Sequence, residues 1–318
     1  MTRLLPASLH AVLAFALLVA NTLFWCGLLL PISVAKLLLP LEGVRKRVDP
    51  ILNRLASCWI ACNGAILWRP REGELDVQGT GNLRAQDWYM VASNHRSWVD
   101  IFVLQRALNG RVPLLKFFLK QELAYVPVIG LAWWALDFPF MRRHGKAALR
   151  KHPELREQDR DATRRACEKF ALTPTSVMTF PEGTRFTDAK HAATPGPYRH
   201  LLKPKAGSLA MSLNAMGAQF RSLLDVTIVY PDGVPTFWQF LGGGAERVIV
   251  RVRQLPITQD LSVGDYTADT AYRRRFHRWL DAVWQDKDEQ IDLLLKAYPS
   301  KASQGQDRRG SSSDELAR

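Results

Sequence analysis

The feature that most constrains the fold is a run of 25 residues without a charged side chain, from Ala11 to Ala35. At about 1.5 Å per helical residue, such a run is long enough to cross a hydrocarbon core of roughly 30 Å. A cleaved signal peptide with Arg3 in its basic n-region is the alternative, but the run is too long and no small-x-small cleavage pattern ends it. We therefore predict an uncleaved membrane anchor over residues 1–40, in which Pro31 permits either a kinked helix or a re-entrant element.

Basic residues lie mainly on the C-terminal side of this run. Only Arg3 precedes it, whereas four basic residues follow it: Lys36, Arg45, Lys46 and Arg47. Because positive charge collects on the cytoplasmic side of membrane proteins, the rest of the chain is expected in the cytoplasm. Residues 41–70 are predicted to form an amphipathic helix, whose apolar side either rests on lipid or packs on the globular domain.

Strand and helix patterns alternate through residues 71–296. This alternation predicts a single α/β domain with a mostly parallel central sheet flanked by helices. Strands are expected at 74–79, 88–92, 113–119, 175–180, 223–230 and 246–254, and helices at 98–109, 145–171, 206–216 and 264–296. Residues 297–318 are polar and poor in apolar side chains, so a disordered tail is expected there.

The charge balance indicates an anionic partner. Lys and Arg number 43 against 30 Asp and Glu, a formal net charge of +13. Ten Trp residues and the apolar run favour an acidic membrane surface. Nucleic acid is disfavoured because no zinc-finger spacing or aromatic RNA-binding motif accompanies the charge. Cys58 and Cys62 have no second pair, so no metal site is predicted and the cysteines are expected to be reduced.

A first polar cluster follows an apolar run at residues 91–93. His95 and Asp100 are five residues apart, so we expect His95 just before a helix and Asp100 in its first turn, where carboxylate and imidazole meet. A carboxylate on Nδ1–H fixes the tautomer and leaves Nε2 able to accept a proton. The alternative is that Ser97 and Asp100 form only a capping box and His95 is an ordinary loop residue. This segment alone favours neither interpretation.

A second polar cluster, Phe180–Arg185, follows another apolar run. Pro181 is expected to end a central strand, Gly183 permits a positive φ or a close backbone approach, and Arg185 offers a planar fork suited to phosphate. Together they predict an anion pocket at the carboxyl end of a strand, in which Glu182 holds Arg185 or a neighbouring helix end in place. An ordinary polar turn with a solvated arginine is the simpler alternative for so short a pattern.

The two clusters occur together and in order, with Glu182 lying 87 residues after His95. The combination of N-H-x-x-x-x-D and F-P-E-G-T-R resembles the 1-acylglycerol-3-phosphate acyltransferase superfamily of membrane glycerolipid acyltransferases, over roughly residues 75–255. The resemblance implies that residues 71–296 are a catalytic domain. It also implies transfer of a fatty acyl group from acyl-CoA or acyl-carrier protein to the free hydroxyl of a lysophospholipid, with no cofactor beyond that co-substrate.

The resemblance also implies roles for individual residues. His95 is the general base and Asp100 orients it, so that the acceptor hydroxyl attacks the thioester directly. Backbone N–H groups at the start of the 98–109 helix are candidates for stabilising the oxyanion. The acceptor and its phosphate are expected to contact Arg142, Glu182, Gly183, Thr184, Arg185, Lys203 and Lys205. The two lysines are as readily explained as solvated loop residues.

Two weaker blocks of sequence agree with the family but depart from its pattern. In D-F-P-F-M-R-R, Met141 stands where an acidic residue usually precedes the phosphate-binding arginine, which leaves Arg142 or Arg143 for that role. In L-D-V-T-I-V-Y-P-D-G, Asp225 opens a D-V-T in place of the usual Val-x-Pro. That form resembles the branch containing lysocardiolipin and lysophosphatidylglycerol acyltransferases, which implies the bacterial inner membrane with the catalytic domain on its cytoplasmic side.

The nearly uncharged segment Tyr125–Phe140 contains Trp133 and Trp134 and is too short to span a bilayer comfortably. It is expected to line the acyl tunnel or to dip into the membrane interface, with ordinary core burial as the alternative. Two other functions stay open: a lipid hydrolase and a catalytically silent lipid-binding scaffold. No G-x-S-x-G elbow supports a hydrolase, and a scaffold would not need the His–Asp pair.

Overall fold

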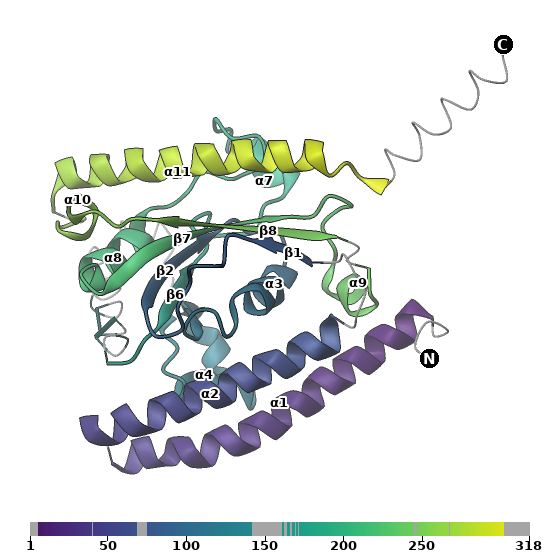
Figure 1. The fold of residues 1–318 in the computed structure, drawn as a ribbon, viewed down its shortest axis with the longest axis vertical. Coiled ribbons are helices and arrows are strands. Elements are labelled where there is room, and N and C mark those ends of the chain that lie inside the picture. Colours follow the sequence, from purple (N-terminus) through teal and green to yellow (C-terminus); the bar gives the residue numbers. More distant parts are fainter. Residues whose placement is uncertain are drawn as a thin grey trace.

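A computed structural model describes residues 6–39, 41–68, 75–141, 172–244, 247–266 and 268–301, together with residues 161, 164, 165, 167, 168 and 170. Figure 1 shows the arrangement: a pair of long N-terminal helices lies on one side of a central sheet, and a long C-terminal helix lies on the other. Arg142, Arg143, most of the predicted 145–171 helix and most of the predicted tail lie outside the described residues.

Six strands form the central sheet, in the order β1-β8-β7-β2-β6-β3. They are Leu75–Gln78 (β1), Trp88–Ser93 (β2), Leu115–Phe117 (β3), Ser176–Thr179 (β6), Phe220–Val229 (β7) and Val248–Leu255 (β8). Within this described sheet, β7 and β8 pair antiparallel and the other neighbours pair parallel. The mostly parallel sheet predicted from the sequence is therefore confirmed. A separate parallel pair joins Leu119–Lys120 (β4) to Phe140–Met141 (β5).

Helices cover both faces of this sheet, as buried parallel strands require. One face carries Gly207–Met216 (α8), Gln259–Ser262 (α10) and Thr270–Ala297 (α11), and the other carries Val99–Leu108 (α3). An apolar stripe of α11 faces the sheet, since Tyr272, Phe276, Leu280 and Trp284 are buried there. This helix begins later than predicted, at Thr270, since the Asp269 side chain caps it by accepting from the backbone N–H groups of Ala271 and Tyr272.

The apolar N-terminal run folds into Ala7–Leu38 (α1), a continuous helix through Pro31, and the chain returns in Glu42–Leu67 (α2). Figure 1 shows these two helices side by side as a hairpin. Besides α2, α1 packs against Ile129–Ala135 (α4) and Phe237–Leu241 (α9). In its most apolar window α1 has a mean hydropathy of 2.2, and 17% of that window is buried. Its length and composition allow a membrane span, yet the helix is tied to the globular domain.

Two of the basic side chains used to predict the orientation in the membrane form ion pairs inside the protein. Lys36 is 8% exposed, and its Nζ lies 2.7 Å from Asp49 Oδ1 and also pairs with Asp137 Oδ2. Arg45 Nη1 lies 3.6 Å from Asp137 Oδ1. These ion pairs tie α1, α2 and the end of α4 together, because a buried charge needs a partner. The charge asymmetry across the apolar run is therefore weaker than the sequence indicated.

The segment with Trp133 and Trp134 forms a short helical turn, Gln121–Tyr125 (η2), followed by α4. One side of α4 is core, since Ala132 and Leu136 pack on the hairpin. The other side is open: Tyr125 is 80% exposed and Trp134 is 51% exposed. The segment is thus part core and part apolar surface.

Candidate active site

The candidate site lies at the edge of the sheet where β2, β6 and β7 end. These strands lead into His95, into Phe180–Arg185 and into Tyr230 respectively. Neighbouring parallel strands present their carboxyl ends at one edge, the usual place for ligands in α/β sheets. Asn94 fixes this edge, because its side chain donates to Ile228 O at 2.9 Å and accepts from Ile228 N at 2.8 Å.

His95 and Asp100 come together as predicted. His95 precedes α3, Asp100 lies in its first turn, and His95 Nδ1 is 2.8 Å from Asp100 Oδ2. The carboxylate thus faces Nδ1 and leaves Nε2 as the ring atom able to accept a proton. The imidazole also stacks on Phe180, with 3.9 Å between ring centroids and an interplanar angle of 14°. Its side chain is 15% exposed, so the ring is held in one orientation yet is accessible to a substrate.

Asp100 also accepts from the backbone of the turn before the helix. Its Oδ2 accepts from Arg96 N at 2.6 Å and from Ser97 N at 2.9 Å. Asp100 thus orients His95 and makes one half of the expected capping box, the bond from Ser97 N, whereas the N-cap residue of α3 is Trp98, which has no side-chain cap. The backbone N–H groups that were expected to stabilise the oxyanion already have acceptors. Arg96 N and Ser97 N donate to Asp100, and Val99 N lies 3.3 Å from Ser97 Oγ. The start of α3 thus uses these three backbone donors within the protein.

Tyr230 is a site residue that the sequence analysis missed. Its hydroxyl donates to Asp100 Oδ1 at 2.6 Å, so each oxygen of that carboxylate has a side-chain partner. Burial raises the pKa of Tyr230 well above its ordinary value, which keeps the hydroxyl protonated and donating. The available signal was its place at the end of a predicted strand, on the edge where the two motifs also end.

Glu182 has a different role from the predicted contact with Arg185 or with the substrate. Its Oε1 accepts from His95 N at 2.8 Å, and its Oε2 accepts from Leu202 N at 3.0 Å. The residue is 1% exposed, so its carboxyl group is not available to an incoming lipid. Glu182 instead joins the loop after β2 to the segment before α8 and thereby positions His95.

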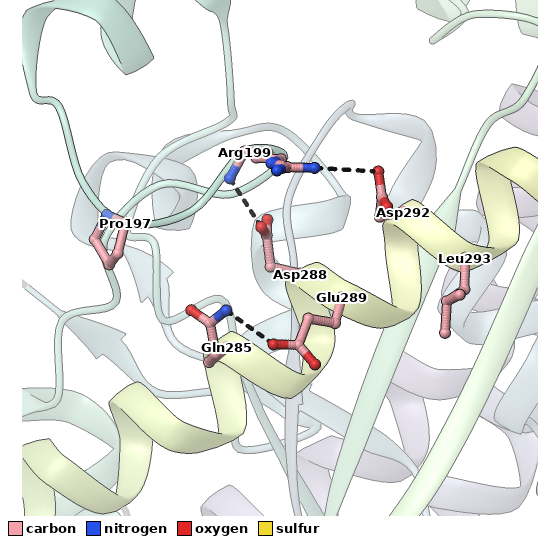
Figure 2. A pocket seen from close by; sticks show the side chains of 7 residues that line it. All are labelled: Pro197, Arg199, Gln285, Asp288, Glu289, Asp292 and Leu293. Atoms are coloured by element: carbon pink, nitrogen blue, oxygen red, sulfur yellow. Dashed lines mark hydrogen bonds and ion pairs between the residues drawn. The ribbon is translucent and has the colours of Figure 1, made fainter.

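The segment before α8 is held in turn by α11. Asp288 of α11 accepts from Arg199 N and His200 N, each at 2.8 Å. Figure 2 shows the bond from Arg199 N to Asp288 and the ion pair between Arg199 and Asp292, at 4.0 Å, in a cavity on α11. Since Leu202 follows in the same segment and donates to Glu182, α11 supports the placement of His95 from the far side of the sheet.

Glu182 gives the stability of the protein a defined pH dependence. Burial raises the pKa of its carboxyl group from 4.5 to about 7. Between these values the folded protein holds a proton that the unfolded chain has lost, so the free energy of unfolding should fall as the pH rises through this window and level off above it. Urea denaturation in detergent at several pH values measures this. In Glu182→Gln this component should disappear, and an unchanged pH dependence in that variant would contradict the assignment.

Gly183 lies against the side chain of Lys205. Gly183 has a φ of 71°, and a Cβ atom there would lie 3.0 Å from Lys205 Nζ. The positive φ and the close approach expected of this glycine are therefore both present. The backbone N–H of Lys205 also donates to Pro181 O at 2.7 Å, which holds this residue beside the turn. Lys203 is exposed two residues earlier.

Arg185 and Thr184 lie at the outer side of this turn. Arg185 is exposed, and its guanidinium carbon lies 5.1 Å from the centre of the Trp98 ring, directly after the His95 turn. Thr184 Oγ1 accepts from Lys190 Nζ at 2.8 Å, and Lys190 lies in Asp188–Ala193 (α7). Arg185, Lys190 and Lys205 thus lie on or against the Phe180–Arg185 turn, whose Phe180 ring stacks on His95, an arrangement suited to an anionic headgroup.

Sequence comparison relates the chain to known acyltransferases. The family model described as Acyltransferase matches residues 74–231, which contain both polar clusters and Tyr230. The chain is 27% identical over 213 residues to 1-acyl-sn-glycerol-3-phosphate acyltransferase delta of Homo sapiens, covering 63% of this chain and 51% of that protein. With the gamma form of Mus musculus, identity is 25% over 225 residues, or 66% and 54% of the two chains. The chain spans about half the length of the curated relatives it matches.

Structural comparison shows the same fold in a solved protein. The crystal structure of the 1-acyl-sn-glycerophosphate (LPA) acyltransferase PlsC from Thermotoga maritima matches with a TM-score of 0.51. The match covers 92% of this chain and 97% of that chain, at 21% sequence identity. The similarity therefore extends over the N-terminal hairpin as well as the α/β domain.

Proposed function

The chain belongs to the 1-acylglycerol-3-phosphate acyltransferase superfamily, and from this premise we propose that it is a membrane-bound O-acyltransferase. The proposed donor is acyl-CoA or acyl-carrier protein, and the proposed acceptor is the free hydroxyl of a lysophospholipid such as 1-acylglycerol-3-phosphate or lysophosphatidylglycerol. The observation that carries this proposal is the contact of 2.8 Å between His95 Nδ1 and Asp100 Oδ2, with the Arg185 guanidinium over the ring of Trp98, which follows in the same turn.

The proposed reaction uses no covalent enzyme intermediate. His95 Nε2 takes the proton of the acceptor hydroxyl as its oxygen attacks the thioester carbonyl carbon. The resulting tetrahedral intermediate collapses, the C–S bond breaks, and the thiolate receives the proton from the imidazolium. Asp100 holds the ring and stabilises the imidazolium. General-base assistance typically contributes about 10²–10⁴ in rate, so positioning of the two substrates supplies much of the remainder.

The cations on and beside the Phe180–Arg185 turn are the proposed binding site for the phosphate of the acceptor. Arg185 is exposed and offers a fork that can bind phosphate through two hydrogen bonds. Lys205 lies against Gly183 in the same turn, and Lys203 is a further exposed candidate. Gly183 contributes by letting the lysine approach the backbone closely.

Arg185→Ala should raise the KM for the acceptor by roughly 10- to 100-fold, the value of a charge-assisted hydrogen bond, with little change in kcat. The reason is that the arginine holds the phosphate equally in the bound substrate and in the transition state. Initial rates against acceptor concentration measure this, with Arg274→Ala, an exposed residue of α11, as the matched control. An acceptor KM equal to that of the unmodified protein would place the phosphate elsewhere.

We propose that the hairpin lies in the membrane surface rather than across the bilayer. The support is that α1 packs on α2, α4 and α9, so a perpendicular helix would carry parts of the domain into the lipid. The outer side of α1 remains apolar and exposed, including Phe24 at 61% and Leu37 at 61%. The family and the remaining basic residues support the cytoplasmic side of a bacterial inner membrane as the location.

A panel of acceptors tests the proposed substrate class. Purified protein in detergent is mixed with oleoyl-CoA or oleoyl-carrier protein and with lysophosphatidate, lysophosphatidylglycerol or lysocardiolipin, and the acylated product is identified by mass spectrometry. Preference for lysophosphatidate would indicate a route to phosphatidic acid, and preference for either of the other lipids would indicate phospholipid remodelling. Absence of product with all three acceptors and both donors would contradict the proposal.

A further inference from the structure

Large apolar side chains continue from the outer side of α1 onto the segment that follows β7. Phe15 of α1 is 43% exposed, and its ring lies 5.5 Å, centroid to centroid, from the Trp238 ring of α9. Trp238 is 56% exposed, and Val234, in the loop before α9, is 39% exposed. These three residues, Phe15, Val234 and Trp238, are named the α9 surface. Figure 1 shows α9 beside the N-terminal part of α1.

The α9 surface leads to the catalytic turn. Ser97 Oγ donates to Pro235 O at 3.0 Å, which joins the loop before α9 to the turn that carries His95. The next residue, Trp98, is 54% exposed, and the Arg185 guanidinium lies over its ring. Exposed apolar side chains therefore extend from the hairpin to the candidate phosphate-binding arginine.

The folding of α9 does not explain why Trp238 is exposed. The helix is capped by Thr236 and Gln239, each of whose side chains bonds the other's backbone N–H. Phe240 and Leu241 are buried, and Leu241 packs against α1. The Trp238 ring contacts Phe15 and Phe237, yet the residue stays 56% exposed, and an exposed aromatic group next to other apolar groups marks a contact surface.

A lipid leaflet is the occupant that the surroundings of the α9 surface favour. The surface is continuous with α1, the most apolar helix described in the chain. Tryptophan is enriched at membrane interfaces, where its ring meets both apolar and polar groups. At the inner end Arg185 provides the positive charge that an anionic lipid headgroup requires.

We propose that the α9 surface contacts the membrane leaflet and guides the lysophospholipid acceptor from it to His95. This inference rests on the proposed function, since it names the path of that acceptor. The acyl chain of the acceptor stays in the leaflet along Phe15 and Trp238, while its headgroup reaches Arg185 and its hydroxyl reaches His95.

The first test compares two acceptors that differ in their need for the membrane. The full-length protein receives long-chain lysophosphatidate in phosphatidylglycerol/phosphatidylcholine vesicles, or a short-chain lysophosphatidate dissolved below its micelle concentration. Trp238→Ala should lower the vesicle rate by about tenfold, the scale of losing one aromatic contact with an apolar phase, and Trp238→Glu should lower it further. The short-chain rate should not change in either variant. Leu293→Glu, at a residue 66% exposed on the opposite side of the sheet, is the control and should keep both rates.

The second test does not depend on turnover. Brominated phosphatidylcholine in the vesicles quenches tryptophan fluorescence on contact, and the quenched signal should be smaller in Trp238→Phe than in the unmodified protein. Trp279→Phe, on α11, is the matched control and should not reduce the quenched signal.

The outcomes distinguish a failure of the proposed lipid contact from a failure of the proposed acyltransferase function. Equal vesicle rates for Trp238→Glu and the unmodified protein, equal losses with both acceptors, or an unchanged quenched signal would each overturn the lipid contact. Loss of quenching in Trp238→Phe without short-chain turnover by the unmodified protein would support the contact and count against the proposed function instead.

Discussion

His95→Ala is expected to lower the rate of acyl transfer by roughly 10²–10⁴-fold while the protein remains folded and membrane-bound. The substitution removes the imidazole that would accept the proton of the acceptor hydroxyl. It keeps the backbone N–H that donates to Glu182, so the loop after β2 retains its anchor. The rate of diacyl product formation at saturating donor and acceptor measures the loss.

The matched control is His277→Ala on α11. His277 Nε2 lies 2.9 Å from Tyr266 Oη, and α11 covers the opposite face of the sheet from α3. This variant should keep the full rate, which separates loss of the site from loss of any histidine. Circular dichroism checks that both variants are folded. Retained turnover in His95→Ala would remove His95 from the role of general base.

Asp100→Asn is expected to have the second large effect, a loss of kcat on the order of 10³–10⁴. In the native protein Oδ2 accepts from His95 Nδ1, Arg96 N and Ser97 N, and Oδ1 accepts from the Tyr230 hydroxyl. An asparagine has one acceptor oxygen, so its NH₂ group must face donors in one of these places. The variant should also lose about 1–3 kcal/mol of unfolding free energy, because buried donors are left without partners.

Tyr230→Phe is the matched smaller change. It removes the donor to Oδ1 and leaves the three contacts of Oδ2, so His95 keeps its orientation. We expect a loss of kcat of about tenfold, the effect of one hydrogen bond to a charged group. Steady-state rates and urea denaturation distinguish the two variants. An Asp100→Asn protein as active as the unmodified one would contradict the orienting role.

Much of the fold was predictable because its signals are local. The predicted helices at 98–109 and 206–216 correspond to Val99–Leu108 and Gly207–Met216. The predicted strand at 88–92 corresponds to Trp88–Ser93, and the alternation of elements indicated a mostly parallel sheet. Periodic apolar patterns and flanking breakers carry this information within each segment. The order of the strands was not predictable, since it depends on pairings between distant segments.

The chemistry of the site was predictable in part, for the same reason. The contact between His95 and Asp100 is local, and the spacing of five residues together with a helix start was enough to predict it. The partners of Glu182 are 87 and 20 residues away, and Tyr230 is 130 residues from Asp100. Contacts of this kind leave no periodic signal in the chain, so Glu182 was assigned to Arg185, a neighbouring helix end or the substrate, and Tyr230 was overlooked.

The contacts of Asp225 explain one departure of this chain from the sequence pattern of the family. Its carboxylate is fully buried, 2.7 Å from Lys287 Nζ on α11 and 2.8 Å from Arg253 Nη2 on β8. A buried charge on β7 is tolerated because these two partners neutralise it. The D-V-T form is thus explained by packing between β7 and α11, which does not by itself identify the headgroup of the acceptor.

The most direct test of acyl transfer follows two products of one reaction. Purified full-length protein in detergent receives oleoyl-CoA with or without lysophosphatidate, and both free thiol and diacyl lipid are measured. Direct transfer at His95 predicts thiol release only in the presence of the lysophospholipid, in a one-to-one ratio to diacyl product, with both lost in His95→Ala. Thiol release without an acceptor would indicate a hydrolase. No product with any lysophospholipid, from acyl-CoA or acyl-carrier protein, would contradict acyl transfer and indicate a lipid-binding scaffold.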